Sequence, residues 1–133
     1  MSQENAEIVR EMYEAFNRED AESALKLLHP EPELHQNPEV IDAEAYVGLE
    51  AFVRGMSLFT EDWDDPRLEP QDVEEVGDCV LMRVRVSGRG KRTGLEMTTE
   101  FFHAWTFRDG KPCRCFVRST RDEALKAVGL EDG

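Results

Sequence analysis

Hydrophobic residues in the first part of the chain recur with the spacing of a helix. In each of three segments, apolar side chains occupy positions i, i+3, i+4 and i+7, which lie on one face of a helix. These positions are Val9, Met12, Tyr13 and Phe16, then Ala21, Ala24, Leu25 and Leu28, then Leu49, Phe52, Val53 and Met56. The spacing predicts three amphipathic helices, each with one buried stripe and a charged outer face.

The second half of the chain has the two-residue period of strands. Alternation predicts strands over residues 67–76, 78–87 and 95–107, and a last strand that returns through Cys113 to Ser119. Asp109 and Gly110 form a strong two-residue hairpin signal, so the last two strands should pair. A short helix over residues 121–128 should follow, and the proline-rich residues 29–38 should form a loop with one short edge strand. Helices followed by antiparallel strands predict an α+β domain.

Alternation also sorts the side chains of each strand between the two faces of the sheet. On the strand over residues 78–87, one face carries Val80, Met82, Val84 and Val86, and the other carries Leu81, Arg83 and Arg85. On the strand over residues 95–107, one face carries Met97, Thr99, Phe101, His103, Trp105 and Phe107. The apolar and aromatic sets should face the interior, which places His103 among apolar neighbours.

The composition limits the partners of the chain. With 29 acidic and 16 basic residues among 133, the formal net charge is −13, which disfavours nucleic acid and anionic membrane surfaces as partners. No apolar run reaches the roughly 18 residues of a membrane span, and the N-terminus lacks the basic and apolar regions of a signal peptide. We therefore expect a cytoplasmic protein.

The cysteines and histidines show no metal-binding pattern. Three cysteines in a chain without an export signal favour reduced thiols. Cys113 and Cys115 are separated by one residue, so on a strand they point to opposite faces. The three histidines lack a paired ligand spacing. We expect neither a metal nor another cofactor.

Two stretches of the chain resemble a known superfamily. They are the amphipathic helix over residues 8–20 and the hairpin over residues 101–111, which reads Phe-Phe-His-Ala-Trp-Thr-Phe-Arg-Asp-Gly-Lys. Together they resemble the SnoaL-like branch of the nuclear transport factor 2-like superfamily, from about Asn5 to Gly129. The resemblance implies one domain over residues 1–133, with N-terminal helices packed in the concave face of a curved, mostly antiparallel sheet. The interior of this cone holds the ligand in isomerases, cyclases, dehydratases and binding proteins.

The resemblance also implies where reactive groups would lie. In ketosteroid isomerases of this superfamily, the strand before the equivalent hairpin carries an inward acid that helps to bind the oxyanion, and His103 occupies that place. The tyrosine of the first helix falls on Met12, next to Tyr13, and the general-base aspartate falls near Gln36. Because two of the three catalytic positions are not carried over, we do not expect a steroid-isomerase mechanism.

His103 and Tyr13 are the candidate catalytic residues. A histidine in an apolar cavity favours its neutral form and can act as a base or donor near neutral pH; the alternative is a core histidine bonded to a carbonyl or a water. Tyr13 lies on a buried stripe, so its hydroxyl is either a pocket donor or part of the core. The candidate ligand-binding residues are His35, Tyr46, Trp63, Met82, Val84, Thr99, Phe101 and Trp105.

Three functions are compatible with the sequence. The leading hypothesis is a protein that binds a small, mostly apolar molecule, because the inward face carries valine, methionine, phenylalanine and tryptophan. The alternatives are a cofactor-free isomerase, cyclase or dehydratase that uses His103 as acid or base, and a structural module whose cone is filled by its own side chains. The outward face, with Leu81, Phe102, Ala104 and Phe116, is apolar enough to predict a homodimer through the outer sheet.

Overall fold

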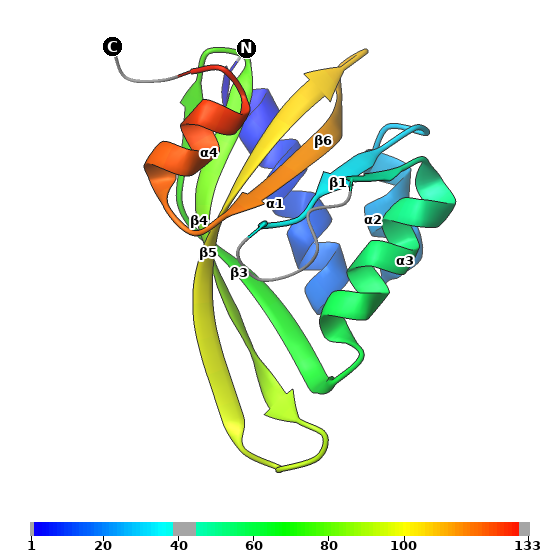
Figure 1. Cartoon of the computed structure of the whole chain (residues 1–133). Coiled ribbons are helices and arrows are strands. Elements are labelled where there is room, and N and C mark those ends of the chain that lie inside the picture. The colour runs from blue at the N-terminus through cyan, green and yellow to red at the C-terminus, as the bar shows by residue number, and fades with distance from the viewer. Residues whose placement is uncertain (1, 39–44, 131–133) are drawn as a thin grey trace.

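The structure is a computed structural model that describes residues 2–38 and 45–130. Within this part of the chain, the helices α1 (Ser2–Asn17), α2 (Ala21–Leu27) and α3 (Leu49–Thr60) lie on one side of a curved sheet (Figure 1). The helix α4 (Arg121–Ala127) lies against the opposite face. The four predicted helices are therefore confirmed, and the chain forms an α+β cone.

The sheet contains six strands among the described residues. They are β1 (Glu33–His35), β2 (Ala45–Val47), β3 (Trp63–Val76), β4 (Cys79–Gly90), β5 (Glu96–Arg108) and β6 (Lys111–Arg118). Their order is β2-β1-β6-β5-β4-β3, and every neighbouring pair is antiparallel except β1 and β6, which are parallel. Asp109 and Gly110 both have positive φ angles, 53° and 78°, as the tight hairpin turn between β5 and β6 requires.

Two predictions about the strands were wrong in detail. The prediction of an edge strand within residues 29–38 is corrected, because β2 pairs with the outer side of β1. The strand β3 begins at Trp63 rather than at residue 67. Its register shifts between Asp64 and Arg67, and Pro66 lies in this irregularity, where a missing N–H group interrupts no regular ladder.

Burial confirms the predicted phase of the long strands. Val80, Met82, Val84 and Val86 of β4 belong to the main core, together with Val9 of α1 and Trp105 of β5. The opposite faces of β4 and β5 contribute to a second, smaller core that contains Leu81 and Ala104. The alternation of side chains therefore separates an inner core under α1 to α3 from an outer core under α4.

The outer core changes the basis of the homodimer prediction. Leu81 and Ala104, which were expected to face outward, pack against Ala124 and Leu125 of α4 and are almost fully buried. Phe102 and Phe116 are only partly buried and pack against this same cluster. Helix α4 thus covers part of the apolar surface that led to this prediction, and the homodimer itself stays a prediction.

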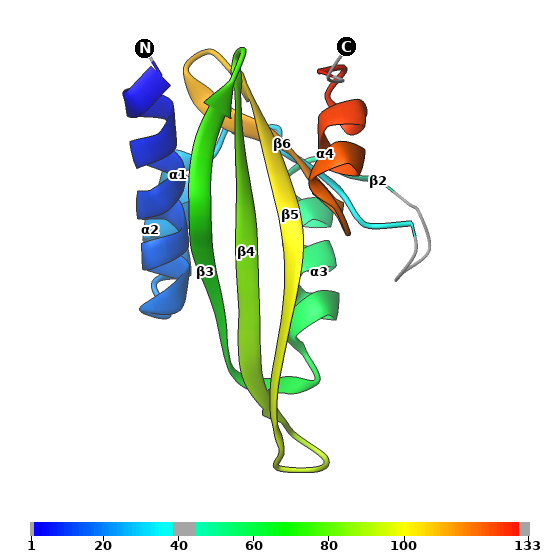
Figure 2. The same cartoon turned by 90° about the vertical axis from the view of Figure 1, so that its left-hand side faces the viewer.

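The β4–β5 hairpin extends beyond the helices as an arm (Figure 2). Residues 91–100, around its tip, are all exposed, including the apolar side chains of Leu95 and Met97. The helices cover the concave face only over the other end of these strands. The pocket described below lies at that covered end.

Candidate functional site

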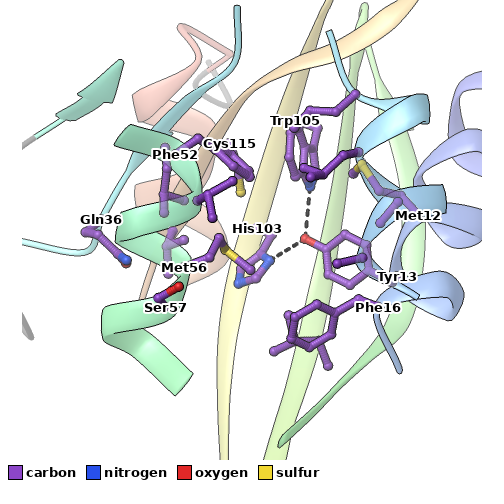
Figure 3. Close-up of a pocket in the computed structure, with 18 residues that line it drawn as sticks. Met12, Tyr13, Phe16, Gln36, Phe52, Met56, Ser57, His103, Trp105 and Cys115 are labelled. Atoms are coloured by element: carbon purple, nitrogen blue, oxygen red, sulfur yellow. Dashed lines mark hydrogen bonds between the residues drawn. The ribbon is translucent and has the colours of Figure 1, made fainter. Parts of the chain in front are cut away.

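A cavity of about 230 Å³ lies between the three N-terminal helices and the concave face of the sheet (Figure 3). The apolar stripes of α1, α2 and α3 form its helical wall, and inward side chains of β1, β3, β5 and β6 form its sheet wall. For comparison, an engineered apolar cavity of about 150 Å³ accepts benzene. The cavity is therefore large enough for a molecule of one or two rings.

Burial distinguishes the floor of the pocket from its mouth. At the floor, Tyr13, His103 and Trp105 are no more than 7% exposed. Ala21 of α2 and Val53 and Ser57 of α3 also line the pocket but are exposed. The opening therefore lies between α2 and α3, and a molecule that entered there would reach the sheet last.

The three buried floor residues are joined by hydrogen bonds (Figure 3). The Nε1–H group of Trp105 donates to the Tyr13 hydroxyl oxygen over 2.9 Å, and this oxygen is 2.6 Å from Nδ1 of His103. His103 and Trp105 are two positions apart on β5 and so share one face, while Tyr13 reaches them from α1. The predicted inward placement of His103 is therefore observed.

Burial keeps the two titratable groups in this set of hydrogen bonds, His103 and Tyr13, neutral. Desolvation lowers the pKa of His103 to about 4, because a charged imidazolium is disfavoured away from water. Desolvation likewise raises the pKa of Tyr13 well above its usual value near 10. Near neutral pH, the pocket floor consequently carries a neutral imidazole and a protonated phenol.

Cys115 of β6 adds a thiol to the same wall. It is 2% exposed, lines the pocket and contacts the Tyr13 hydroxyl. Burial raises the pKa of its thiol far above the usual range. Cys115 is therefore a small, protonated wall residue and a poor nucleophile in the native protein.

Gln36 and Ser57 also line the pocket, on the side opposite Tyr13 in Figure 3. Gln36 follows β1, and Arg118 holds this segment by donating from Nη1 to the carbonyl oxygens of His35 and Gln36 at 3.2 and 3.4 Å. Sequence reasoning did not name either residue as a site residue. A signal existed for both: the resemblance placed the general base near Gln36, and Ser57, although not among the predicted stripe residues, follows Val53 by four positions and so lies on the same side of the helix.

Of the ten predicted site residues, the structure brings three together at the pocket floor, namely Tyr13, His103 and Trp105. Phe101 packs against the main core from the same strand, and Met82 and Val84 lie within that core; none of these three lines the pocket. Thr99 has the inward phase but is exposed, because it lies on the arm beyond the helices.

The other three predicted ligand-binding residues also lie outside the pocket wall. His35 bonds through Nε2 to Glu33 at 2.9 Å and stacks on Phe116. Its neighbour Leu34 is the residue of β1 that lines the pocket. Tyr46 packs against α3 at Gly55, and Trp63 covers Gly88 at the base of the arm. A three-residue strand and a helix boundary carry too little alternation to predict these orientations.

Among residues 2–38 and 45–130, no three histidine, cysteine, aspartate or glutamate side chains come together in a group that could hold a metal ion. No helix in the described part of the chain is long and apolar enough to cross a membrane.

Comparison with known proteins identifies the family. The sequence model of the SnoaL-like domain matches residues 9–114, a segment that runs from α1 into β6 and contains all three floor residues. The chain belongs to the SnoaL-like domain family. This SnoaL-like domain shares its fold with solved structures of nuclear transport factor 2-like proteins. No curated protein matches its sequence.

Solved structures share the fold of this SnoaL-like domain at low sequence identity. A proposed SnoaL-like polyketide cyclase from Jannaschia sp. superposes with a TM-score of 0.76 at 14% identity, covering 99% of this chain and 95% of that one. TerC, crystallised with polyporic acid, has a TM-score of 0.73 at 24% identity, and the match covers 97% of this chain and 99% of TerC. A nuclear transport factor 2-like protein of unknown function from Burkholderia pseudomallei has a TM-score of 0.74 at 21% identity, and the match covers 95% of this chain and 98% of that one.

Proposed function

We propose that this SnoaL-like domain binds a small, mostly apolar molecule in the pocket between α1, α2, α3 and the sheet. The observation that carries the proposal is the cavity of about 230 Å³, whose apolar walls lead to a floor with a few hydrogen-bonded polar groups. Small-molecule sites typically combine apolar walls with a small number of placed polar groups. The same cavity argues against the structural module whose cone is filled by its own side chains.

The relatives are compatible with this proposal but do not identify the ligand. TerC was crystallised with polyporic acid, and the Jannaschia protein has been proposed as a polyketide cyclase. At 24% and 14% identity, these likenesses extend to the fold only. Only the pocket of this chain therefore bears on the class of ligand.

A cofactor-free isomerase, cyclase or dehydratase is the second candidate. It is favoured by the direct contact between His103 and Tyr13, since two groups able to exchange protons meet at the buried end of the pocket. However, general acid–base catalysis is most effective when the pKa lies near the working pH, and burial lowers the pKa of His103 to about 4. The ligand-free pocket is therefore better suited to hydrogen bonding than to proton abstraction.

Native mass spectrometry and a thermal-shift screen test the binding proposal. We expect a co-purified molecule, or a reproducible rise in melting temperature with aromatic ketones or acids of one or two rings. Ser57→Trp should abolish the rise because it fills the exposed mouth, whereas Arg54→Trp, on an exposed position of the same helix outside the pocket wall, should preserve it. Binding in this pocket would be contradicted if no molecule co-purified and no compound raised the melting temperature. It would also be contradicted if a compound raised the melting temperatures of both variants equally.

Substitution of His103 distinguishes the two candidate functions. In a binding protein, His103→Gln should alter affinity only a few-fold, because glutamine can still donate a hydrogen bond. In an enzyme, the same change should lower turnover by about 10² or more, because the proton-transferring group is lost.

A further inference from the structure

The hydrogen bonds at the pocket floor have a direction that starts at Trp105. An indole Nε1–H group can only donate, so the Tyr13 oxygen must accept this bond. Both residues are buried, which leaves few other partners for either group. The Tyr13 hydroxyl proton then has to be donated elsewhere.

The acceptor of that proton is His103. The Tyr13 hydroxyl has two neighbours that could accept: Nδ1 of His103 at 2.6 Å and the sulfur of Cys115. A neutral imidazole nitrogen is a much better acceptor than a thiol sulfur, and 2.6 Å is at the short end of the range for bonds donated by a hydroxyl. Tyr13 stays protonated and therefore able to donate, because burial raises its pKa.

This direction determines the tautomer of His103. A neutral imidazole carries one N–H group, so if Nδ1 accepts from Tyr13, the proton is on Nε2. In Figure 3, this second ring nitrogen points away from Tyr13, to the side of the pocket where Met56 and Ser57 lie.

We propose that Trp105 and Tyr13 are positioning residues that hold neutral His103 with its proton on Nε2, so that the pocket floor presents one hydrogen-bond donor. The pocket then selects apolar ligands whose inner end carries an oxygen acceptor, such as a ketone or quinone carbonyl. This selection rests on the proposed binding function, whereas the tautomer is a property of the ligand-free protein. An experiment can therefore contradict the ligand selection without contradicting the tautomer, and the reverse.

Long-range ¹H–¹⁵N correlation spectra of the ¹⁵N-labelled, ligand-free protein test the positioning role. The signals of His103 are assigned by their loss in His103→Gln. We expect an unprotonated Nδ1 and a protonated Nε2 throughout pH 5.5–8. A wild-type protein with the proton on Nδ1 would overturn the proposal.

Two variants test whether Trp105 and Tyr13 set this state. Tyr13→Phe removes the group that donates to Nδ1, and Trp105→Phe releases the tyrosine oxygen to accept from the imidazole; each should give a mixture of tautomers. Tyr46→Phe is the matched control, since it removes one hydroxyl from a buried tyrosine outside the pocket wall. Persistence of a pure Nε2–H state in both test variants would show that the contacts are only structural. If Tyr13→Phe fails to fold, Trp105→Phe decides alone.

A matched pair of ligands tests the selection. Dissociation constants are measured for 2-acetylnaphthalene and for 2-ethylnaphthalene, which have nearly the same shape but differ by the carbonyl oxygen. We expect the ketone to bind about tenfold more tightly to the wild type, as one additional hydrogen bond would give, and the difference to shrink to about twofold in Tyr13→Phe. Equal binding of both probes would overturn the selection while leaving the binding function intact. Binding of neither would count against the binding function and the selection together, and the spectra alone would then decide the positioning role.

Discussion

The Tyr13 hydroxyl oxygen and Nδ1 of His103 lie 2.6 Å apart, although 90 positions separate the two residues in the chain. One belongs to α1 and the other to β5, so this contact joins the first helix to the middle of the sheet. Trp105 completes the contact by donating to the same oxygen. The polar floor of the pocket is thus also a structural link between the two layers of the cone.

We predict that Tyr13→Phe destabilises the protein by about 1–3 kcal/mol. The change leaves the buried Nε1–H group of Trp105 and Nδ1 of His103 without their hydroxyl partner. Urea unfolding followed by circular dichroism measures the loss, with Tyr46→Phe as the control for removal of a buried tyrosine hydroxyl. A loss no greater than that of the control would show that water replaces the hydroxyl without cost.

We predict that stability falls as the pH drops from about 6.5 to about 4. Burial lowers the pKa of His103 from 6.5 to about 4, so within this window the unfolded chain binds a proton that the folded chain excludes. The unfolding free energy therefore decreases with falling pH, by about 3 kcal/mol in total, and the contribution is fully present above pH 6.5.

The variant His103→Gln isolates this contribution. Other titrating groups act in both proteins, so the difference between the two pH profiles of unfolding free energy reports on His103. The variant should lose less stability between pH 7 and pH 4.5 than the wild type. Parallel profiles would mean that the imidazole titrates in the folded protein as it does in the unfolded one.

The inward faces of the long strands could be predicted because side chains alternate with a period of two. Val80, Met82, His103 and Trp105 all took their predicted face. Alternation does not show how far the helices extend over a strand, so the exposure of Thr99 on the arm could not be predicted. The helical period was limited in the same way. It placed Met12, Phe16 and Met56 on buried stripes, but it could not show that these stripes enclose a cavity.

Short elements account for most of what could not be predicted. The strands β1 and β2 have three residues each, which is too few to show a phase, and so the orientations of His35 and Tyr46 depend on tertiary contacts. The irregularities in β3 could not be predicted for a different reason: each register shift breaks the regular alternation on which the prediction depends. The hydrogen bonds from Trp105 through Tyr13 to His103 could not be predicted either, because they depend on atomic distances between segments that are far apart in the sequence.

We predict that Asn17→Ala destabilises the protein by about 1–3 kcal/mol. The Asn17 side chain donates through Nδ2 to the carbonyl oxygen of Leu68 and accepts from the Leu68 amide, at 2.9 and 2.8 Å, which fastens the end of α1 to the edge strand β3. Asn17→Asp should be at least as harmful at pH 7, because a carboxylate oxygen then faces the Leu68 carbonyl. Urea unfolding compares both with Arg18→Ala, an exposed neighbour; equal stabilities would contradict the prediction.

We predict that Gly55→Ala costs about 1–3 kcal/mol through overpacking, even though alanine is the better helix former by about 1 kcal/mol. A Cβ atom at this position would lie 2.9 Å from two ring carbons of Tyr46 and 3.1 Å from Leu34, both buried. Relief of this overlap would move α3, which carries part of the pocket wall. Thermal unfolding should therefore show a lower melting temperature than for Arg54→Ala, an exposed change in the same helix, and an unchanged or higher one would refute the prediction.

We predict that Leu125→Ala costs about 2–5 kcal/mol and increases self-association. Leu125 is 2% exposed and packs with Leu81 and Ala104 beneath α4, so its truncation leaves a cavity and loosens the helix that covers the outer face of the sheet. Urea unfolding measures the cost, and gel filtration at micromolar concentration measures association, with Lys126→Ala as the exposed control on α4.

The wild type should elute as the predicted homodimer, and a wild-type monomer would contradict that prediction. Since α4 separates Leu81 and Ala104 from any partner, a variant that forms larger species than the wild type would indicate that α4 protects this apolar surface, whereas unchanged elution would show that it remains covered.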